Sequence, residues 1–137
     1  AVYGGEMSAH HYFRDFAYCD SGMLPWMLII ELMSRTGKKL SELVDERIER
    51  FPVSGEINRR IEDPAGLLDR LELLYGADAD RVDHVDGLSV EYPDWRFNVR
   101  ASNTEPVVRL NVESRGNKEL MMQKRDELLA HMGGEPA

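Results

Sequence analysis

The stretch of the chain that decides its fold runs from residue 95 to residue 112 and reads WRFNVRASNTEPVVRLNV. Trp95, Phe97 and Val99 alternate with polar residues, which is the period of a strand with one buried face and one exposed face. The same alternation resumes over residues 107–112. The sequence therefore predicts two strands joined by a short polar loop.

The loop between these strands, residues 100–106, is rich in hydrogen-bond donors, and we call it the donor-rich loop. Its side-chain donors come from Arg100, Ser102, Asn103 and Thr104. A guanidinium, hydroxyls, a carboxamide and backbone N–H groups can all donate to a tetrahedral oxyanion, which indicates a phosphate site. The alternative is an ordinary turn, because Ser, Asn and Thr also satisfy their own backbone in strand connections. Glu105 is the one acidic residue here, and we expect it to face away or to orient Arg100.

The pattern on either side of this hairpin predicts an α+β domain. Short strands are expected at residues 56–62 and 88–92, with a further short strand left open around Val82. Asp63 followed by proline, and later Asn117, can cap helices with regularly spaced apolar residues. The resulting order predicts a mainly antiparallel four-stranded sheet with its helices on one face.

Residues 1–51 follow a different, mostly helical pattern. A helix that is apolar nearly all round is expected from about residue 23 to a stop at Thr36-Gly37, followed by an amphipathic helix to about Arg50. Residues 52–55, Pro-Val-Ser-Gly, mark the boundary between this part and the α+β domain. Because the first residues begin as if inside a structural element, we expect a fragment of a longer protein.

The composition is that of a globular protein without a broad basic surface. The 137 residues are 42% hydrophobic and carry a net charge of −8. An acidic balance disfavours nucleic acid and anionic membranes as partners, although it permits one local basic pocket. The longest apolar run, residues 23–33, is shorter than a membrane span and is broken by Pro25 and Glu31. A single cysteine, Cys19, excludes an internal disulfide and suits a reducing compartment.

A second polar segment, residues 5–10, reads GEMSAH. Preceding glycines permit a sharp backbone path, and alternate residues of an extended segment share a face, so Glu6, Ser8 and His10 can point to one side. Such a trio suits sugar hydroxyls. The alternative, favoured for the segment in isolation, is that Glu6 caps a helix and His10 is an ordinary loop residue. A weak further alternative is a metal site with Glu6, His10, His11 and Asp15 as its ligands. Adjacent histidines point in different directions, and no standard ligand spacing occurs.

These two segments resemble motifs of the α-D-phosphohexomutase family. GEMSAH is similar to the family's sugar-binding loop, usually written GEMSGH, and RASNTEP at 100–106 is similar to its C-terminal phosphate-binding loop. Asp86-Gly87-Leu88 and Tyr92-Pro93 resemble the fourth domain of these enzymes, and Asp20-Ser21-Gly22 resembles the end of their third domain. The likeness covers essentially the whole chain, and the bacterial phosphomannomutase branch is the most similar. Ala9, where the family commonly has glycine, is a departure.

The resemblance implies a role for each part of the chain. Residues 1–51 would be the C-terminal, helical part of the third domain, which is α/β, and residues 52–137 would be the fourth domain. Glu6 and Ser8 would hold sugar hydroxyls, and His10 would lie near the reacting end of the substrate. The phosphate that is not being transferred would be bound by Arg100, Ser102, Asn103 and Thr104.

The activity that the resemblance implies belongs to a full-length parent. It is the interconversion of mannose 6-phosphate and mannose 1-phosphate, with glucose phosphates left open, through a hexose 1,6-bisphosphate and with Mg²⁺, in the cytoplasm. The family's phosphoserine loop (TASHNP) and magnesium loop (DGDGDR) do not occur in these 137 residues. We therefore expect no catalytic residue, no metal ligand and no activity in the fragment alone. Without its N-terminal domains, the apolar run 23–33 could favour self-association. The rival interpretation is a standalone anion-binding or interaction module.

Overall fold

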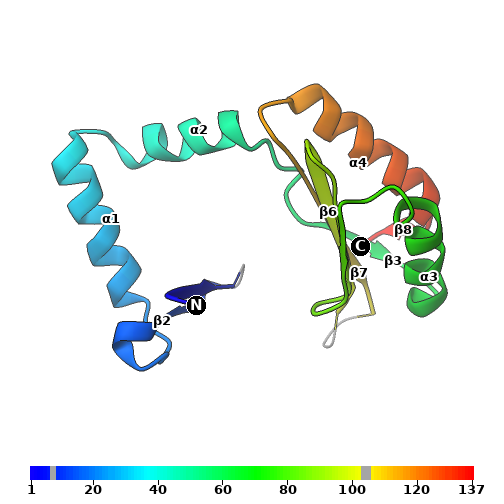
Figure 1. The fold of residues 1–137 in the computed structure, drawn as a ribbon, viewed down its shortest axis with the longest axis horizontal. Helices are drawn as coiled ribbons and strands as arrows, with labels where there is room; N and C mark the ends of the chain where they lie inside the picture. Colours follow the sequence, from blue (N-terminus) through cyan, green and yellow to red (C-terminus); the bar gives the residue numbers. More distant parts are fainter. Residues whose placement is uncertain (7–8, 103–105) are drawn as a thin grey trace. The chain divides into compact units, whose positions relative to one another are not determined.

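The computed structural model describes residues 1–6, 9–102 and 106–137. The chain divides into two compact units, residues 1–45 (the N-terminal unit) and residues 46–137 (the C-terminal unit) (Figure 1). No helix among the described residues is both long enough and apolar enough to cross a membrane.

The N-terminal unit consists of a small hairpin followed by helices. Its elements are β1 (Tyr3–Gly5), β2 (His11–Phe13), the 3₁₀ helix η1 (Arg14–Phe16), α1 (Met23–Thr36) and α2 (Leu40–Arg50), the last of which continues into the C-terminal unit. β1 and β2 pair in antiparallel fashion, with Gly4 opposite Tyr12. The predicted stop of the first helix is confirmed, because Gly37 has a φ of +68° and donates its N–H to the Met33 carbonyl at 2.9 Å.

The apolar side chains of α1 are not buried within this chain. Trp26, Leu28 and Ile30 are 57%, 50% and 45% exposed, and no residue of α1 is buried. A helix that is apolar nearly all round is normally covered on more than one side. The sequence of α1 is therefore suited to a more enclosed environment than the described residues of the N-terminal unit give it.

The C-terminal unit has the predicted α+β class, but its sheet has six strands rather than four. The elements are β3 (Ile57–Arg60), α3 (Pro64–Tyr75), β4 (Arg81–Asp83), β5 (Leu88–Glu91), β6 (Trp95–Ala101), β7 (Val108–Ser114), α4 (Lys118–Met132) and β8 (Glu135–Pro136). The strand order is β4-β5-β6-β7-β3-β8, and all neighbouring pairs are antiparallel. The prediction missed β8 and left β4 open because strands of two or three residues are too short to show an alternating pattern.

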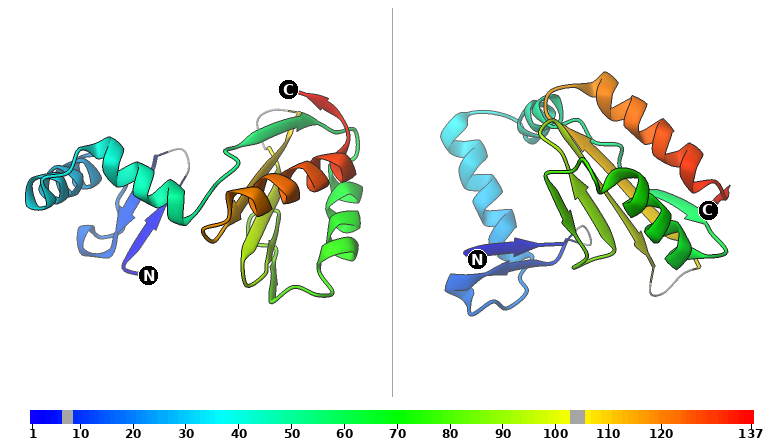
Figure 2. Two further views of the ribbon diagram at one scale, coloured as in Figure 1. Left: turned by 90° about the horizontal axis from the view of Figure 1, so that it is seen from above. Right: turned by 45° about the vertical axis from the view of Figure 1, so that its right-hand side comes forward.

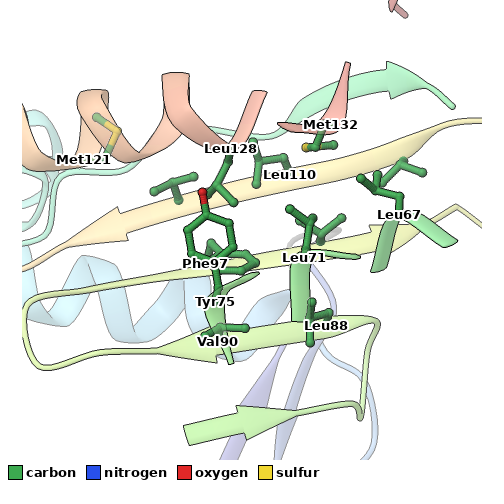
Figure 3. Close-up of a cluster of buried hydrophobic side chains, with 13 residues drawn as sticks. Leu67, Leu71, Tyr75, Leu88, Val90, Phe97, Leu110, Met121, Leu128 and Met132 are labelled. Carbon is green, nitrogen blue, oxygen red and sulfur yellow. The ribbon is translucent and has the colours of Figure 1, made fainter. Parts of the chain in front are cut away.

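Both helices of this unit lie on the same face of the sheet (Figures 1 and 2). Each begins at a side-chain cap that the sequence predicted: Asp63 Oδ1 accepts from Gly66 N–H at 3.0 Å, and Asn117 Oδ1 accepts from Leu120 N–H at 2.9 Å. Between helices and sheet lies one core, drawn in Figure 3, whose largest fully buried side chains are Phe97, Leu67, Leu71, Leu88, Leu110 and Leu128. Burying each such side chain stabilises the fold by about 1.5–3 kcal/mol.

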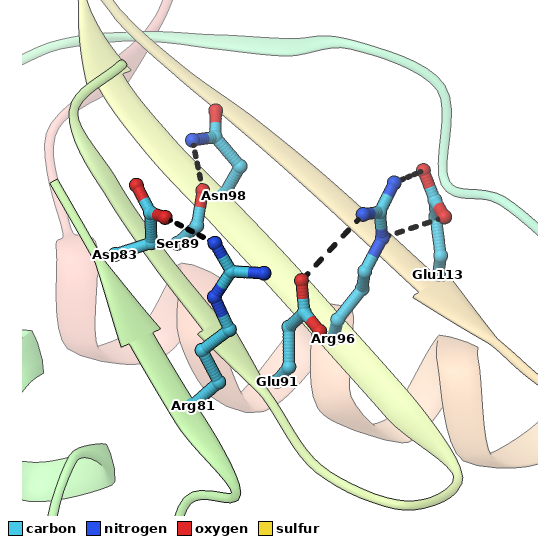
Figure 4. Close-up of polar contacts among 7 residues, drawn as sticks. All are labelled: Arg81, Asp83, Ser89, Glu91, Arg96, Asn98 and Glu113. Atoms are coloured by element: carbon cyan, nitrogen blue, oxygen red, sulfur yellow. Dashed lines mark hydrogen bonds and ion pairs between the residues drawn. The ribbon is translucent and has the colours of Figure 1, made fainter. Parts of the chain in front are cut away.

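The opposite face of the sheet is polar, and we call it the polar face. Figure 4 shows its residues on β4, β5, β6 and β7. Arg96 makes two hydrogen bonds to Glu113, from Nε at 2.9 Å and Nη2 at 3.0 Å. Asn98 Nδ2 donates to Ser89 Oγ at 2.9 Å. Because Arg100 follows Arg96 and Asn98 on alternate positions of β6, its side chain lies on this same face.

Candidate functional site

Arg100 stands at the end of β6, where the sequence analysis placed it. The strand closes with Ala101, and Ser102 N–H then donates to the Val107 carbonyl at 2.9 Å. This hydrogen bond brings the two ends of the donor-rich loop together at the edge of the hairpin. Asn103 and Thr104, together with Glu105, lie outside the described residues.

Two carboxylates flank the Arg100 guanidinium. Nη2 lies 3.6 Å from Glu56 Oε2, and Nη1 lies 3.5 Å from Asp86 Oδ2. The Arg100 side chain is 28% exposed, so its charge is partly shielded from water. The sequence alone predicts neither acid here and offers only Glu105 as a group that could orient Arg100. No local pattern could have shown Glu56, because only the pairing of β3 with β7 brings it near β6.

The position of Asp86 depends on the glycine that follows it. Gly87 has a φ of +72°, and a Cβ at this position would lie 2.7 Å from the Cα and from the Cβ of Arg100. Such a close approach is tolerated only without a side chain. Gly87 therefore allows the turn before β5 to pass over Arg100, which brings the Asp86 carboxylate beside the guanidinium.

A second arginine lies next to Arg100. Arg109 on β7 is directly opposite Arg100 in the register of β6 and β7. Its Nε lies 3.7 Å from Glu56 Oε1, so the two oxygens of one carboxylate face two guanidinium groups. Among the described residues, the end of the polar face beside the donor-rich loop thus brings together two cations and two anions.

Hydrogen bonds join the described ends of the GEMSAH segment in the N-terminal unit. Glu6 N–H donates to the His10 carbonyl at 2.9 Å, and Ala9 N–H donates to the Glu6 carbonyl at 3.1 Å. Tyr12 Oη donates to Glu6 Oε1 at 2.8 Å, which holds this carboxylate. Ser8 lies outside the described residues. Ala9 has a φ of +64°, so the departure from glycine falls where an L side chain costs about 1–2 kcal/mol.

His10 is held by Asp20. His10 Nδ1 lies 2.6 Å from Asp20 Oδ2, and the other oxygen, Oδ1, accepts from His11 N–H at 3.0 Å. The hydrogen bond with Asp20, and then its negative charge, raise the pKa of His10 above the ordinary imidazole value. The same bond lowers the pKa of Asp20. With Nδ1 bound to the carboxylate, Nε2 is the ring nitrogen directed away from Asp20.

Asp20 is a residue whose role the sequence analysis did not identify. It lies shortly before α1, where the N-cap residue is Gly22 and Ser21 Oγ accepts from Leu24 N–H at 3.4 Å. The Asp20 carboxylate instead accepts hydrogen bonds from the segment that carries His10. An aspartate ten positions after the histidine carries no local signal for this contact.

The described residues offer no site for a metal ion. No group of three or more His, Cys, Asp or Glu side chains within residues 1–6, 9–102 and 106–137 could hold one. The family resemblance implies that magnesium is held by a DGDGDR-type loop, which does not occur in these 137 residues.

Comparison with known proteins relates the whole chain to one family. The model of "Phosphoglucomutase/phosphomannomutase, alpha/beta/alpha domain III" matches residues 1–51, and that of "Phosphoglucomutase/phosphomannomutase, C-terminal domain" matches residues 56–131. A phosphomannomutase of Salmonella montevideo is 60% identical over 129 residues, which are 94% of this chain and 28% of that protein. A phosphohexose mutase of Xanthomonas campestris is 52% identical over 93% of this chain and 29% of its own length.

A solved structure supports the same relationship. The phosphoglucomutase/phosphomannomutase family protein of Burkholderia thailandensis matches with a TM-score of 0.69 and 28% identity, over 99% of this chain and 30% of that chain. The chain spans about 28% of the length of the curated phosphomannomutases from Salmonella that it matches.

Proposed function

The chain belongs to the phosphoglucomutase/phosphomannomutase family, and we propose that it is the C-terminal, substrate-binding part of a phosphomannomutase. The observation that carries this proposal is the 60% identity with a phosphomannomutase over 129 residues. In this proposal, residues 1–51 complete the third domain and residues 52–137 form the fourth. The proposal includes a cytoplasmic location, and a magnesium ion held elsewhere in the full-length protein.

The proposed reaction interconverts mannose 6-phosphate and mannose 1-phosphate, with glucose phosphates as further candidate substrates. A phosphorylated serine outside these 137 residues transfers its phosphoryl group to the free hydroxyl of the sugar phosphate, which gives a hexose 1,6-bisphosphate. The other phosphoryl group then returns to the serine. The net change is an isomerisation, and the bisphosphate must be held in either orientation.

The donor-rich loop is proposed to bind the phosphate that stays in place. Arg100 would supply a charge-assisted contact, and Ser102, Asn103 and Thr104 would supply neutral donors. These groups recognise a tetrahedral anion whichever carbon bears it, so the loop tolerates both orientations of the sugar. Fixing the distant phosphate also positions the reacting oxygen.

The GEMSAH segment is proposed to bind the sugar. Glu6 and Ser8 would hold hydroxyl groups that are equivalent in the two orientations. The hydroxyl that attacks the phosphoserine must lose its proton, and His10 Nε2 is suited to accept it because Asp20 holds the opposite ring nitrogen. The hydrogen bond with Asp20 also raises the pKa of His10, which makes its imidazole a stronger base.

The proposal is tested by kinetics of the full-length protein with the change Arg100→Ala. Loss of a charge-assisted phosphate contact should cost about 2 kcal/mol of transition-state stabilisation. The value of kcat/KM for mannose 1-phosphate should therefore fall about thirtyfold. Arg60→Ala is the matched control, because Arg60 is an exposed arginine of the same sheet. Equal kcat/KM for Arg100→Ala and the unmodified protein would remove Arg100 from the site.

A second test separates this proposal from a standalone binding module. The sequence of the 137 residues lacks TASHNP-type and DGDGDR-type motifs, so the isolated chain should show no mutase activity. Conversion of mannose 1-phosphate by the pure chain would contradict this division of roles. A full-length gene product without a phosphorylatable serine loop would favour the binding module.

A further inference from the structure

Glu56 is the residue that joins the two arginines beside the donor-rich loop. Like charges placed directly opposite on neighbouring strands destabilise a sheet, and Arg100 and Arg109 are such a pair. Glu56 lies within 3.6 Å of one and 3.7 Å of the other. All three side chains are about three-quarters buried, so solvent screens their attraction less than at an open surface.

The backbone fixes the place of Glu56. Just before it, Ser54 is tied to β7 twice: its N–H donates to the Val112 carbonyl, and its Oγ accepts from Val112 N–H, both at 2.9 Å. Just after it, β3 pairs with β7 and sets Ile57 opposite Leu110. Because Ile57 faces the core, Glu56 points to the polar face, diagonally across from Arg109.

The contacts of Arg100 differ from those of its neighbour on the same face. Arg96 is engaged by Glu113 through two short hydrogen bonds, at 2.9 and 3.0 Å. The nitrogens of Arg100 lie 3.5 and 3.6 Å from their carboxylates, longer than the 2.7–2.9 Å typical of charge-assisted hydrogen bonds. Charge attraction therefore holds the guanidinium from two sides, and a phosphate can form short hydrogen bonds to it without first replacing short ones.

We propose that Glu56, with Asp86 on the other side, is a positioning residue that holds Arg100 ready for the phosphate. The proposal rests on the proposed function, because it deepens the role of the same loop. A long side chain that is ordered before the ligand arrives loses less conformational freedom on binding. Freeing Arg100 should therefore weaken substrate binding more than it slows the chemical step.

A repulsive role and a positioning role for Glu56 predict opposite changes in KM. If Glu56 mainly repels the phosphate dianion, its neutralisation should lower KM. If Glu56 mainly positions Arg100, Glu56→Gln should raise KM. The experiment measures KM and kcat of the full-length protein for mannose 1-phosphate, together with the thermal midpoint of each variant.

We expect Glu56→Gln to raise KM about fivefold, the order expected for releasing one flexible side chain, with kcat within about twofold. Glu113→Gln is the matched control, because it breaks an arginine–glutamate pair on the same face of the same sheet without touching Arg100. Its KM should be unchanged. In an Arg100→Ala background, Glu56→Gln should cause no further rise in KM, whereas a merely structural role would add its own effect.

Asp86→Asn is the second variant, and it tests the proposal if Glu56→Gln does not fold. Asp86 is 71% exposed, so this change should leave the fold intact and raise KM about twofold. The positioning role is overturned if KM is unchanged or lowered in Glu56→Gln. If Glu56→Gln does not fold, the same result in Asp86→Asn overturns it. If Arg100→Ala itself leaves KM unchanged, the proposed phosphate site is wrong, and the role inferred for Glu56 is wrong as well.

Discussion

Gly87→Ala is the substitution whose cost can be worked out most fully from the structure. A φ of +72° places the residue in the left-handed region, where an L side chain costs about 1–2 kcal/mol. The added Cβ would also lie 2.7 Å from Arg100 Cα, and such overpacking against backbone costs about 1–3 kcal/mol more. We therefore expect the free energy of unfolding to fall by about 2–5 kcal/mol.

Gly116→Ala provides the control for the steric part of this estimate. Gly116 has a similar φ of +61°, but no described atom lies within 4 Å of an added Cβ. Its replacement should cost only the conformational term, about 1–2 kcal/mol. Both variants can be compared by urea unfolding of the 137-residue chain, followed by Trp95 fluorescence in a Trp26→Phe background so that the C-terminal unit is reported. Equal losses of stability would refute the close approach of the Gly87 turn to Arg100.

Two further predictions concern the GEMSAH segment. Ala9→Gly should stabilise the N-terminal unit by about 1 kcal/mol, because Ala9 has a φ of +64°; an unchanged or lower unfolding free energy would argue against this turn. Asp20→Asn should lower the pKa of His10 toward its ordinary value, measurable by NMR titration of the imidazole. In the unmodified chain, protonated His10 should stabilise the hairpin fully at pH below the ordinary imidazole pKa. This stabilisation should be lost as the pH rises through the raised pKa of His10. A hairpin whose stability does not change with pH would contradict the pairing of His10 with Asp20.

The sequence predicted the local features of the fold because their signals are local. The caps at Asp63 and Asn117 and the stop at Gly37 each depend on a few neighbouring residues. The alternation through residues 95–112 likewise placed β6 and β7. Short strands escaped prediction because pairing partners, rather than their own residues, keep them extended.

The candidate site was predictable only where its residues are close together in the chain. The donor-rich loop and the GEMSAH segment could be identified from consecutive residues, and they remain predictions as binding sites. The partners that hold them could not: Glu56 reaches Arg100 only through the order of the sheet, and Asp20 reaches His10 only through the fold of the hairpin. Ion pairs between distant segments depend on tertiary structure, which a single sequence does not show.

The central claim is that the donor-rich loop binds the phosphate of a sugar phosphate. It is tested most directly by titrating the ¹⁵N-labelled 137-residue chain with mannose 6-phosphate and, separately, with mannose, while the backbone amides are followed by NMR. The account predicts saturable shifts for the amides of residues 100–105 and of Val107 with mannose 6-phosphate, their absence with mannose, and their loss in Arg100→Ala. If the amide signals of this loop stay unmoved at millimolar mannose 6-phosphate while those of residues elsewhere shift, the claim is contradicted.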